Sequence, residues 1–341
     1  MAGHRFQHPR RITFRRTMAA LLVFWVVTAT LCKSSIAASY EEFPDHSVKL
    51  IVGSATGSAV DIIARLFAQH LSELWKQPVI IDNRSGANGQ IAAGVVARSG
   101  PDGYTLMVTT AATLTTNPVL YPDTGQFVVE DLEPVTVLVR NDFVVAARSS
   151  LNVRTFEEFL AFARANPGKL NVATSVRGGA ANLTAELFKQ RSQLEYTVVP
   201  FNGGGASINS LLGGHTEATF ESLTLTEPLA EAGQLVHLAT TGQARSPFTP
   251  KVPTVAETGY PGFEVSGWLA VVAPKGTPLE LRRKIQSDIA TVARRGNVVD
   301  QVSKLKMDVV VDSPEDFRER WNREISTWRN FLAKKGTNVD R

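Results

Sequence analysis

The chain has 341 residues, of which 43% are hydrophobic and 20% charged, and it carries one cysteine and a formal charge of +4. At roughly 150 residues per domain, this length predicts two domains and is sufficient to bury a large core. The ordinary composition excludes collagen-like and disordered proteins, and the single cysteine excludes a disulfide framework.

The positive charge is concentrated at the N-terminus. Residues 1–17 carry five arginines and no acidic side chain, and an uncharged apolar run, Met18–Cys32, precedes the small residues Ser35–Ala38. This order is typical of a secretory signal that is cleaved after Ala37, so residues 1–37 are predicted to be a signal peptide. The apolar run has about 15 residues where a bilayer span needs about 20, which makes an uncleaved anchor the less favoured alternative.

Removal of residues 1–37 changes the charge balance. The remaining 304 residues carry 30 basic and 32 acidic side chains, a net charge of −2, and no cysteine. A nucleic-acid partner is therefore not expected, because such proteins present a basic footprint. The predicted mature protein is exported and lacks disulfides and thiol chemistry.

Strand-like and helix-like segments then alternate along the chain. The predicted strands are Val48–Val52, Val79–Ile81, Tyr104–Thr109, Leu170–Thr174, Thr197–Phe201, Ala218–Phe220 and Val236–Thr240. The predicted helices are Ser58–Trp75, Ile91–Ala97, Thr155–Ala165, Ala180–Gln190 and Ala206–Leu212. This alternation predicts an α/β fold with mainly parallel sheets covered by helices on both faces.

Three polar residues are predicted to begin helices. Thr155, Thr277 and Ser313 each precede an acidic residue by three positions, and proline follows the last two directly. These are N-cap signals, with proline at the first helical position. No flexible linker divides the chain, so two apolar strand-like stretches, Val137–Ala147 and Glu264–Ala273, are the predicted crossings between domains.

The sequence offers little support for catalysis. The four histidines beyond the signal, at positions 46, 70, 215 and 237, match no metal-ligand spacing, so no metal site is expected. There is no nucleophile elbow and no lysine-bearing phosphate loop. The triplet Gly203–Gly205 lacks dinucleotide-binding spacing, so no cofactor is expected either.

Small polar residues instead gather in four loops that follow predicted strands. These loops are Gly53–Ser58, Thr109–Thr116, Ser175–Asn182 and Asn202–Ala206. Ligands of open α/β sheets bind at the carboxyl ends of strands, where helix N-termini suit carboxylate or phosphate. The alternative is that tight turns simply prefer such residues.

Several fragments together resemble one family. They are Val48–Val52, Asp61–Arg65, Gln77–Gly89, Pro101–Leu106, Asn117–Tyr121, Asn166–Asn171, Leu211–Gly214 and Val252–Glu257. From about Phe43 to the C-terminus, the chain is similar to the Bug (TctC-type) family of periplasmic solute-binding proteins, which serve tripartite tricarboxylate transporters.

The resemblance implies a two-lobed, type II-like Venus-flytrap fold. Each lobe would be a mainly parallel sheet flanked by helices, with two strand crossovers as the hinge. Residues 38–140 and 270–341 would form lobe 1, and residues 141–269 would form lobe 2.

The resemblance also implies a ligand site between the lobes. Lobe 1 would hold a ligand carboxylate, through backbone amides and bridging water, with Gly53, Ser54, Ala55, Thr56, Gly57 and Ser58 and with Thr110, Ala111, Ala112 and Thr113. Lobe 2 would supply selectivity with Ser175, Arg177, Gly178, Asn182, Asn202, Gly203 and Glu221.

Two loops depart from the family pattern. The first lacks both prolines of the usual Pro-x-Pro-Ala-Gly-Gly, and the third lacks Ser-Gly-x-Gly-Ser and a histidine. Arg177 either pairs with a second acidic group of the ligand or is a solvated rim residue. Glu221 either accepts a ligand amine or hydroxyl or bonds neighbouring amides. Asp61, three residues after Ser58, is predicted to cap the helix rather than to touch ligand.

The function expected from these observations is capture of a small carboxylated solute and its delivery to permease subunits of a tripartite tricarboxylate transporter. The solute would be a dicarboxylate, tricarboxylate, acidic amino acid or aromatic carboxylate, and the protein a monomer without enzymatic activity. The alternative is a ligand-responsive periplasmic signalling protein that docks to a membrane sensor. An exported hydrolase would need a nucleophile–base pair, which the scattered histidines disfavour.

Overall fold

The computed structural model describes Gly3 and residues 42–120 and 129–335. The predicted signal peptide, residues 1–37, lies outside the described residues apart from Gly3. The chain divides into two compact units, Met1–Asp45 and His46–Arg341, and the second unit contains the strands and helices that follow. In the part of the chain that is described, no helix is both long and apolar enough to cross a membrane.

The strands of the second unit run in the order β2-β1-β3-β9-β4-β7-β5-β6, with β8 and β10 also paired to β4. Their bounds are β1 Val48–Val52, β2 Val79–Asn83, β3 Thr105–Thr110, β4 Leu132–Arg148, β5 Leu170–Thr174, β6 Tyr196–Pro200, β7 Ala218–Ser222, β8 Leu235–Thr240, β9 Ser266–Pro274 and β10 Asp308–Val309. β1 is parallel to β2 and β3, and β5 is parallel to β6 and β7. The pairs made by β4 and β9 are antiparallel, so the sheet is mixed.

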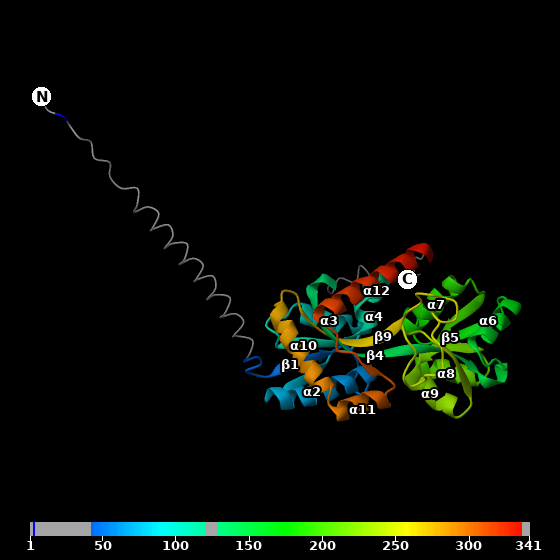
Figure 1. The fold of residues 1–341 in the computed structure, drawn as a ribbon, viewed down its shortest axis with the longest axis horizontal. Helices are drawn as coiled ribbons and strands as arrows, with labels where there is room; N and C mark the ends of the chain where they lie inside the picture. Colours follow the sequence, from blue (N-terminus) through cyan, green and yellow to red (C-terminus); the bar gives the residue numbers. More distant parts are fainter. Residues whose placement is uncertain (1–2, 4–41, 121–128, 336–341) are drawn as a thin grey trace. The chain divides into compact units, whose positions relative to one another are not determined.

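Helices cover both parallel groups of strands (Figure 1). Their bounds are α2 Ala59–Trp75, α3 Gln90–Ala97, α4 Ala111–Leu114, α5 Asn117–Leu120, α6 Phe156–Ala165, α7 Ala180–Ser192, α8 Gly204–Leu212, α9 Leu223–Glu231, α10 Leu279–Ala293, α11 Gly296–Lys304 and α12 Pro314–Lys335. The predicted α/β class is confirmed, and the predicted strands and helices match these bounds to within two residues.

Two long strands connect the halves. From Leu132 to Asp142, β4 pairs with β9, and from Phe143 onward it pairs with β7 and β8. The predicted crossings therefore coincide with β4 and with β9 and its approach. The lobe limits drawn at 140/141 and 269/270 stay a prediction.

Two hydrophobic clusters lie on either side of these crossings. One contains Ile51, Met107 and Trp268, and the other contains Phe156 and Phe188 among many further apolar side chains. Burial of large aromatic side chains in each cluster supplies much of the stabilising free energy of its half.

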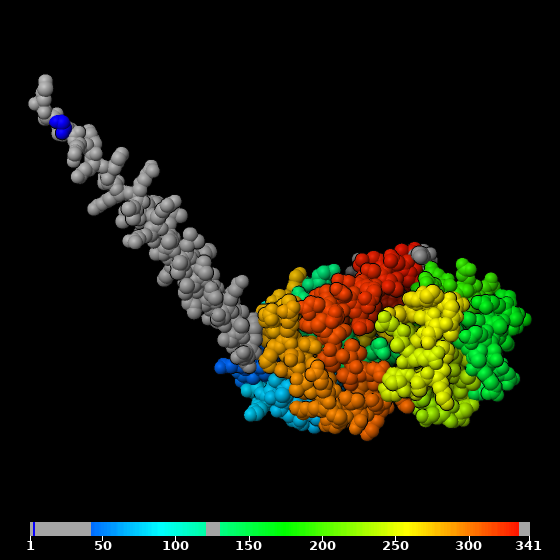
Figure 2. Space-filling view, viewed as in Figure 1, coloured from blue at the N-terminus to red at the C-terminus, as the bar shows by residue number. Residues whose placement is uncertain are grey.

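The C-terminal helix α12 belongs to both clusters. Phe317 and Trp321 pack in the cluster around Met107, whereas Trp328 and Phe331 pack in the cluster around Phe156. Trp321 Nε1 donates a hydrogen bond to the Leu114 carbonyl at 2.9 Å. In Figure 2, α12 (red) extends from the orange helices to the yellow and green surface of the other half. The helix thus fastens the two halves beside the crossing strands.

Two of the three predicted helix caps are confirmed. Thr155 Oγ1 accepts from Glu158 N–H at 3.2 Å, and Ser313 Oγ accepts from Asp316 N–H at 3.0 Å. The prediction for Thr277 is wrong, because α10 begins one residue later than expected. The Thr277 hydroxyl instead donates to the Pro274 carbonyl at 2.7 Å and closes the turn that leaves β9.

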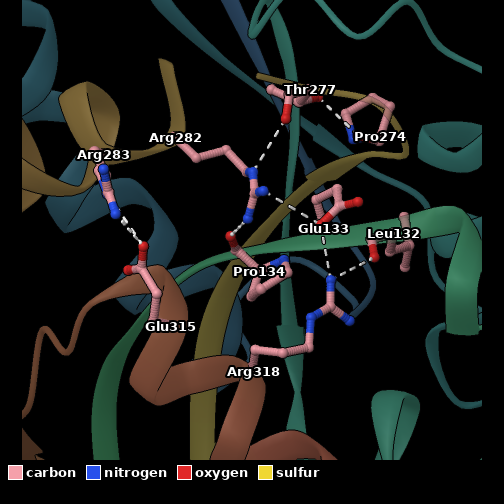
Figure 3. A network of polar contacts seen from close by, with 9 residues as sticks. All are labelled: Leu132, Glu133, Pro134, Pro274, Thr277, Arg282, Arg283, Glu315 and Arg318. Carbon is pink, nitrogen blue, oxygen red and sulfur yellow. Dashed lines mark hydrogen bonds and ion pairs between the residues drawn. The ribbon is translucent and has the colours of Figure 1, made fainter. Parts of the chain in front are cut away.

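A network of ion pairs fixes α10 and α12 to the start of β4 (Figure 3). Glu133 Oε2 lies 2.8 Å from Arg318 Nη2 and 3.5 Å from Arg282 Nη2. Arg282 also donates to the Pro134 carbonyl at 3.0 Å. Arg282 Nε donates to the Thr277 carbonyl at 3.1 Å, so each nitrogen of this largely buried guanidinium has a partner.

Candidate functional site

The two predicted loops of the first half meet at Gly89. β1 and β3 are parallel neighbours, so Gly53–Ser58 and Thr110–Thr113 follow adjacent strand ends. A Cβ placed on Gly53 would lie 3.2 Å from Gly89 Cα, and a Cβ on Gly89 would lie 2.7 Å from Thr113 Oγ1. The positive φ of 85° at Gly89 and this close approach both require glycine.

The first loop is held by Asp61 and Asn83. Asp61 Oδ2 accepts from Gly57 N–H, and Asn83 Nδ2 donates to Asp61 Oδ1 at 2.9 Å and to the Ser54 carbonyl at 3.1 Å. The hydrogen bond from Arg65 is the main cause that lowers the pKa of Asp61 to about 2. The predicted capping role of Asp61 is confirmed, and these bonds restrain a loop that has lost both family prolines.

Hydrogen bonding occupies the hydroxyl groups at the start of α4. Thr113 Oγ1 donates to the Asn88 carbonyl at 2.9 Å, and Thr110 Oγ1 accepts from Thr113 N–H at 3.4 Å. Thr113 is 2% exposed, whereas Ala55 and Thr56 in the first loop are exposed. Thr113 therefore supports the loop that carries Asn88, and the exposed part of the first-half site is Ala55–Gly57.

In the second half, Asn182 organises the loop that precedes α7. Its Oδ1 accepts from Gly178 N–H at 3.0 Å, and its Nδ2 donates to Thr174 Oγ1 at 3.1 Å. Both polar ends of the Asn182 side chain are thereby used within the protein. Arg177 on the same loop is exposed and forms no ion pair within the described residues.

Glu221 lies between the loop that contains Ser175 and the loop that begins α8. It follows Phe220 on β7, is 3% exposed, and its Oε2 would lie 3.1 Å from a Cβ on Gly204. Burial raises the pKa of Glu221 to about 7, against the hydrogen bonds from Ser207 and Ser175, which favour the charged form. Its Oε1 is buried and has no hydrogen-bond partner in the described part of the chain.

The predicted site residues thus fall into two groups. Gly53–Ser58 and Thr110–Thr113 come together in the first half, and Ser175 and Glu221 come together in the second, beside Gly204, which was not among the predicted site residues. Asn202 and Gly203 lie in the loop that begins α8, next to Gly204.

Two exposed apolar residues of the second half were not among the predicted site residues. Val176 is 50% exposed and Leu225 is 39% exposed. The Leu225 side chain lies so close to Gly204 that it would clash with a Cβ at that position. Leu225 lies in α9, a helix absent from the sequence prediction. Leu223 and Leu225 are two positions apart, which is not a helical spacing, and Pro228 lies inside the helix, so the sequence does not indicate it.

Two of the histidines lie beside glutamate side chains. His70 lies 3.1 Å from Glu73 Oε2, and His237 lies 3.4 Å from Glu227 Oε2. Burial lowers the pKa of His237 to about 4, so its ring is neutral at pH 7. Among the described residues, no three His, Cys, Asp or Glu side chains are close enough to hold a metal ion.

Comparison with known families identifies the fold. Residues 63–336 match the TctC family, described as the tripartite tricarboxylate transporter family receptor. The chain belongs to this family. The resemblance inferred from the sequence fragments is thereby confirmed, and with it the periplasmic solute-binding class of the protein.

Several TctC-type proteins are similar over most of their length. Protein BugT of Bordetella pertussis is 31% identical over 317 residues, which cover 92% of this chain and 97% of BugT. The structure "R. palustris Rpa4515 with adipate" is 33% identical, has a TM-score of 0.72, and is matched over 86% of this chain and 98% of its own. MatC of Rhodopseudomonas palustris with bound malate is 27% identical, with a TM-score of 0.68 and coverage of 85% and 100%.

These likenesses agree with the architecture described above. The solved structures of periplasmic binding protein BugD and of a TctC solute binding protein from Polaromonas have the same fold, with TM-scores of 0.69 and 0.78. A periplasmic location follows from membership of this class.

Proposed function

We propose that this protein captures a small organic carboxylate between its two predicted lobes and delivers it to the permease of a tripartite tricarboxylate transporter. Membership of the TctC receptor family carries the proposal, and relatives solved with adipate and malate support the carboxylate class. Residues 1–37 are proposed to direct export and to be removed.

The first-half loop suits one carboxylate of the ligand. The exposed segment Ala55–Gly57 precedes α2, a 17-residue helix whose N-cap is Ser58. Unpaired N–H groups and the positive end of the helix dipole favour an anion at such a position. Asp61 lies behind the loop, where Arg65 and Gly57 N–H offset its charge.

The second half is proposed to set selectivity. Arg177 is exposed and without an ion pair in the described structure, so its guanidinium is available for a second carboxylate. The unpartnered Oε1 of Glu221 would accept a hydrogen bond from a ligand hydroxyl or amine, or donate one when protonated. Val176 and Leu225 would contact an apolar segment of the ligand between its polar ends.

A thermal-shift screen of the purified protein tests the proposal. Carried-over ligand is first removed by unfolding and refolding, and the panel contains adipate, malate, citrate, aspartate and benzoate. A ligand at 100 times its Kd stabilises the folded protein by about 2.7 kcal/mol, which gives a clear shift. Absence of any shift across the panel would contradict the carboxylate proposal. Because no catalytic step is proposed, the bound ligand should be recovered chemically unchanged.

The role of Arg177 is tested with a matched pair of arginines. Arg177→Ala should weaken the best dicarboxylate about 10-fold, equivalent to about 1.4 kcal/mol, and leave a monocarboxylate nearly unaffected. Arg164→Ala, which removes an exposed arginine from α6, should change neither affinity. If Arg177→Ala weakens binding of both ligand types equally, Arg177 does not pair with a second carboxylate and lies only at the rim of the cleft.

A further inference from the structure

A cavity lies beside the predicted ligand loops. It has a volume of about 230 Å³ and is bounded by α4, α7, α12 and residues 262–266, the segment that leads into β9. Of the predicted site residues, only Ala111 and Ala112 line it. The cavity is therefore distinct from the positions occupied by Ala55–Gly57, Arg177 and Glu221.

The walls of this cavity are mainly apolar. Leu187, Phe263, Val265 and Trp328 contribute large apolar side chains, and Ala180 a small one. The hydroxyl groups that line it are paired within the protein. Thr115 Oγ1 donates to the Ala111 carbonyl at 2.9 Å, Thr116 Oγ1 donates to the Ala112 carbonyl at 3.1 Å, and Ser266 Oγ donates to Asp142 at 2.7 Å.

Charged groups enter the cavity from α12. The helix contributes Arg320, Arg323 and Glu324, which lie on one face because they are three and four residues apart. Glu324 Oε1 accepts from Trp268 Nε1 at 2.8 Å. Arg320 Nε is buried 3.5 Å from Asp312 Oδ2, so Arg320 is paired with that carboxylate, whereas the exposed Arg323 forms no ion pair within the described residues.

The charge of the cavity favours an anion. Arg191 also lines it, with Nη2 bonded to the Pro261 carbonyl at 3.0 Å, while Glu264 and Glu324 are its acidic groups. Burial raises the pKa of Glu324 to about 7, so this carboxyl is only partly charged at neutral pH. Asp312 is the partner of Arg320, so the three guanidinium groups exceed the charge of Asp312, Glu264 and the partly protonated Glu324 only slightly, and Arg323 carries the guanidinium without an ion pair in the described part of the chain.

We propose that this cavity is a second binding site, for a small carboxylic acid with an apolar body, whose carboxylate pairs with Arg323. The size is suitable, because an apolar protein cavity of about 150 Å³ admits benzene. The apolar body would lie against Phe263 and Trp328. The site does not depend on the proposed function of the cleft loops.

Occupation of this site would affect both halves of the protein. Ala111 and Thr115 come from the first half, Ala180 and Leu187 come from the second, and α12 packs on both. A ligand that contacts both halves favours the arrangement in which its contacts are best. The binding of a solute at the loops would then be coupled to the second site.

Benzoate, cyclohexanecarboxylate and hexanoate are the probes, and their binding to the purified protein is measured by calorimetry. Thr327→Trp places an indole in the cavity from the exposed side of α12, and Ser326→Trp is its matched control, since Ser326 does not line the cavity. Thr327→Trp should weaken the acid that binds best about 10-fold or more, and Ser326→Trp less than about 2-fold. Equal effects of the two variants would overturn the proposal.

The charge requirement is tested on the same helix. Arg323→Ala should weaken the acids but not benzamide, which has the shape of benzoate without its charge, and Arg329→Ala should affect neither. Absence of binding by all three acids, or loss of binding with Thr56→Trp but not with Thr327→Trp, would overturn the proposal. The dicarboxylate screen and Arg177→Ala measure the cleft separately, so the failure of one proposal is distinguishable from that of the other.

Discussion

At Asp61, one buried carboxylate accepts hydrogen bonds from Gly57 N–H, Asn83 Nδ2 and Arg65 Nε. Asp61→Ala should lower the free energy of unfolding by about 2–4 kcal/mol, because the partly buried Asn83 amide and the Gly57 N–H lose their acceptor. Arg65→Ala is the control and should cost less than about 1 kcal/mol, since the Arg65 side chain is half exposed. Urea denaturation measures both, and equal losses would show that the ion pair, rather than the loop bonds, carries the stability.

For single residues, the sequence predicted roles whose partners are nearby in the chain better than roles whose partners are many residues away. The spacing of Ser58 and Asp61 indicates a cap because both partners lie on one helical turn. Thr113 and Glu221 are different, since the Asn88 carbonyl is 25 residues from Thr113 and the burial of Glu221 depends on Ser207 and Gly204. Residue type and position could place these side chains near the site but could not show which polar atoms remain unpaired.

Among the elements, α10 and α12 share one acidic residue on β4, Glu133, as Figure 3 shows. Glu133→Ala should lower the free energy of unfolding by about 1–3 kcal/mol, because the guanidinium groups of Arg282 and Arg318 lose their counter-charge in a partly buried position. Glu280→Ala removes a 64% exposed carboxylate from α10 and should cost less than about 0.5 kcal/mol. Chemical denaturation of the two variants compares them, and a Glu133→Ala loss as small as that of the control would contradict a fastening role.

Elements were predictable wherever the apolar pattern was regular. The sequence predicted β1, β2, β3 and β5 to β8, because each is a short apolar run and these runs alternate with helical segments. Helix α9 was missed because Pro228 lies inside it, and proline ordinarily interrupts a helix. The Thr277 cap failed because a threonine hydroxyl can bond a nearby carbonyl instead of the helix amides.

For the whole molecule, the fragments that resemble the TctC family predicted the two-lobed class, and the long apolar runs predicted the two crossings. The attachment of α12 to both halves was not predictable in the same way. Trp328 and Phe331 continue the apolar stripe of Phe317 and Trp321, and a periodic stripe does not specify which core each residue enters. That assignment depends on how the halves are arranged around β4 and β9.

The whole molecule should also show a pH dependence of stability that follows from its buried carboxyls. Burial raises the pKa of Glu221 and of Glu324 from 4.5 to about 7. Both groups bind a proton more tightly in the folded protein than in the unfolded chain, so the stability they contribute is complete below about pH 4.5 and is lost as the pH rises through about 7. Asp61 acts in the opposite sense, because its pKa is lowered to about 2 and its contribution is lost as the pH falls below about 4. His237 opposes the decline between about pH 4 and pH 6.5, because burial lowers its pKa to about 4 and its contribution is lost as the pH falls through that range. The two carboxyls outweigh it, so the free energy of unfolding should decline between about pH 5 and pH 8.

A double variant, Glu221→Gln with Glu324→Gln, isolates the two carboxyls that carry this decline. Each substitution should remove about 1–3 kcal/mol of the loss of stability between about pH 5 and pH 8, because glutamine does not ionise. The slope that remains comes from other groups, among them Asp142, Asp308 and Asp312, whose pKa burial raises, and His237, whose pKa burial lowers. Chemical denaturation at several pH values measures the slope, and Glu280→Gln, at an exposed site, should leave it unchanged. A slope in the double variant equal to that of the unmodified protein would mean that neither carboxyl keeps its proton in the folded state at pH 6, and that their burial is relieved by contacts with solvent.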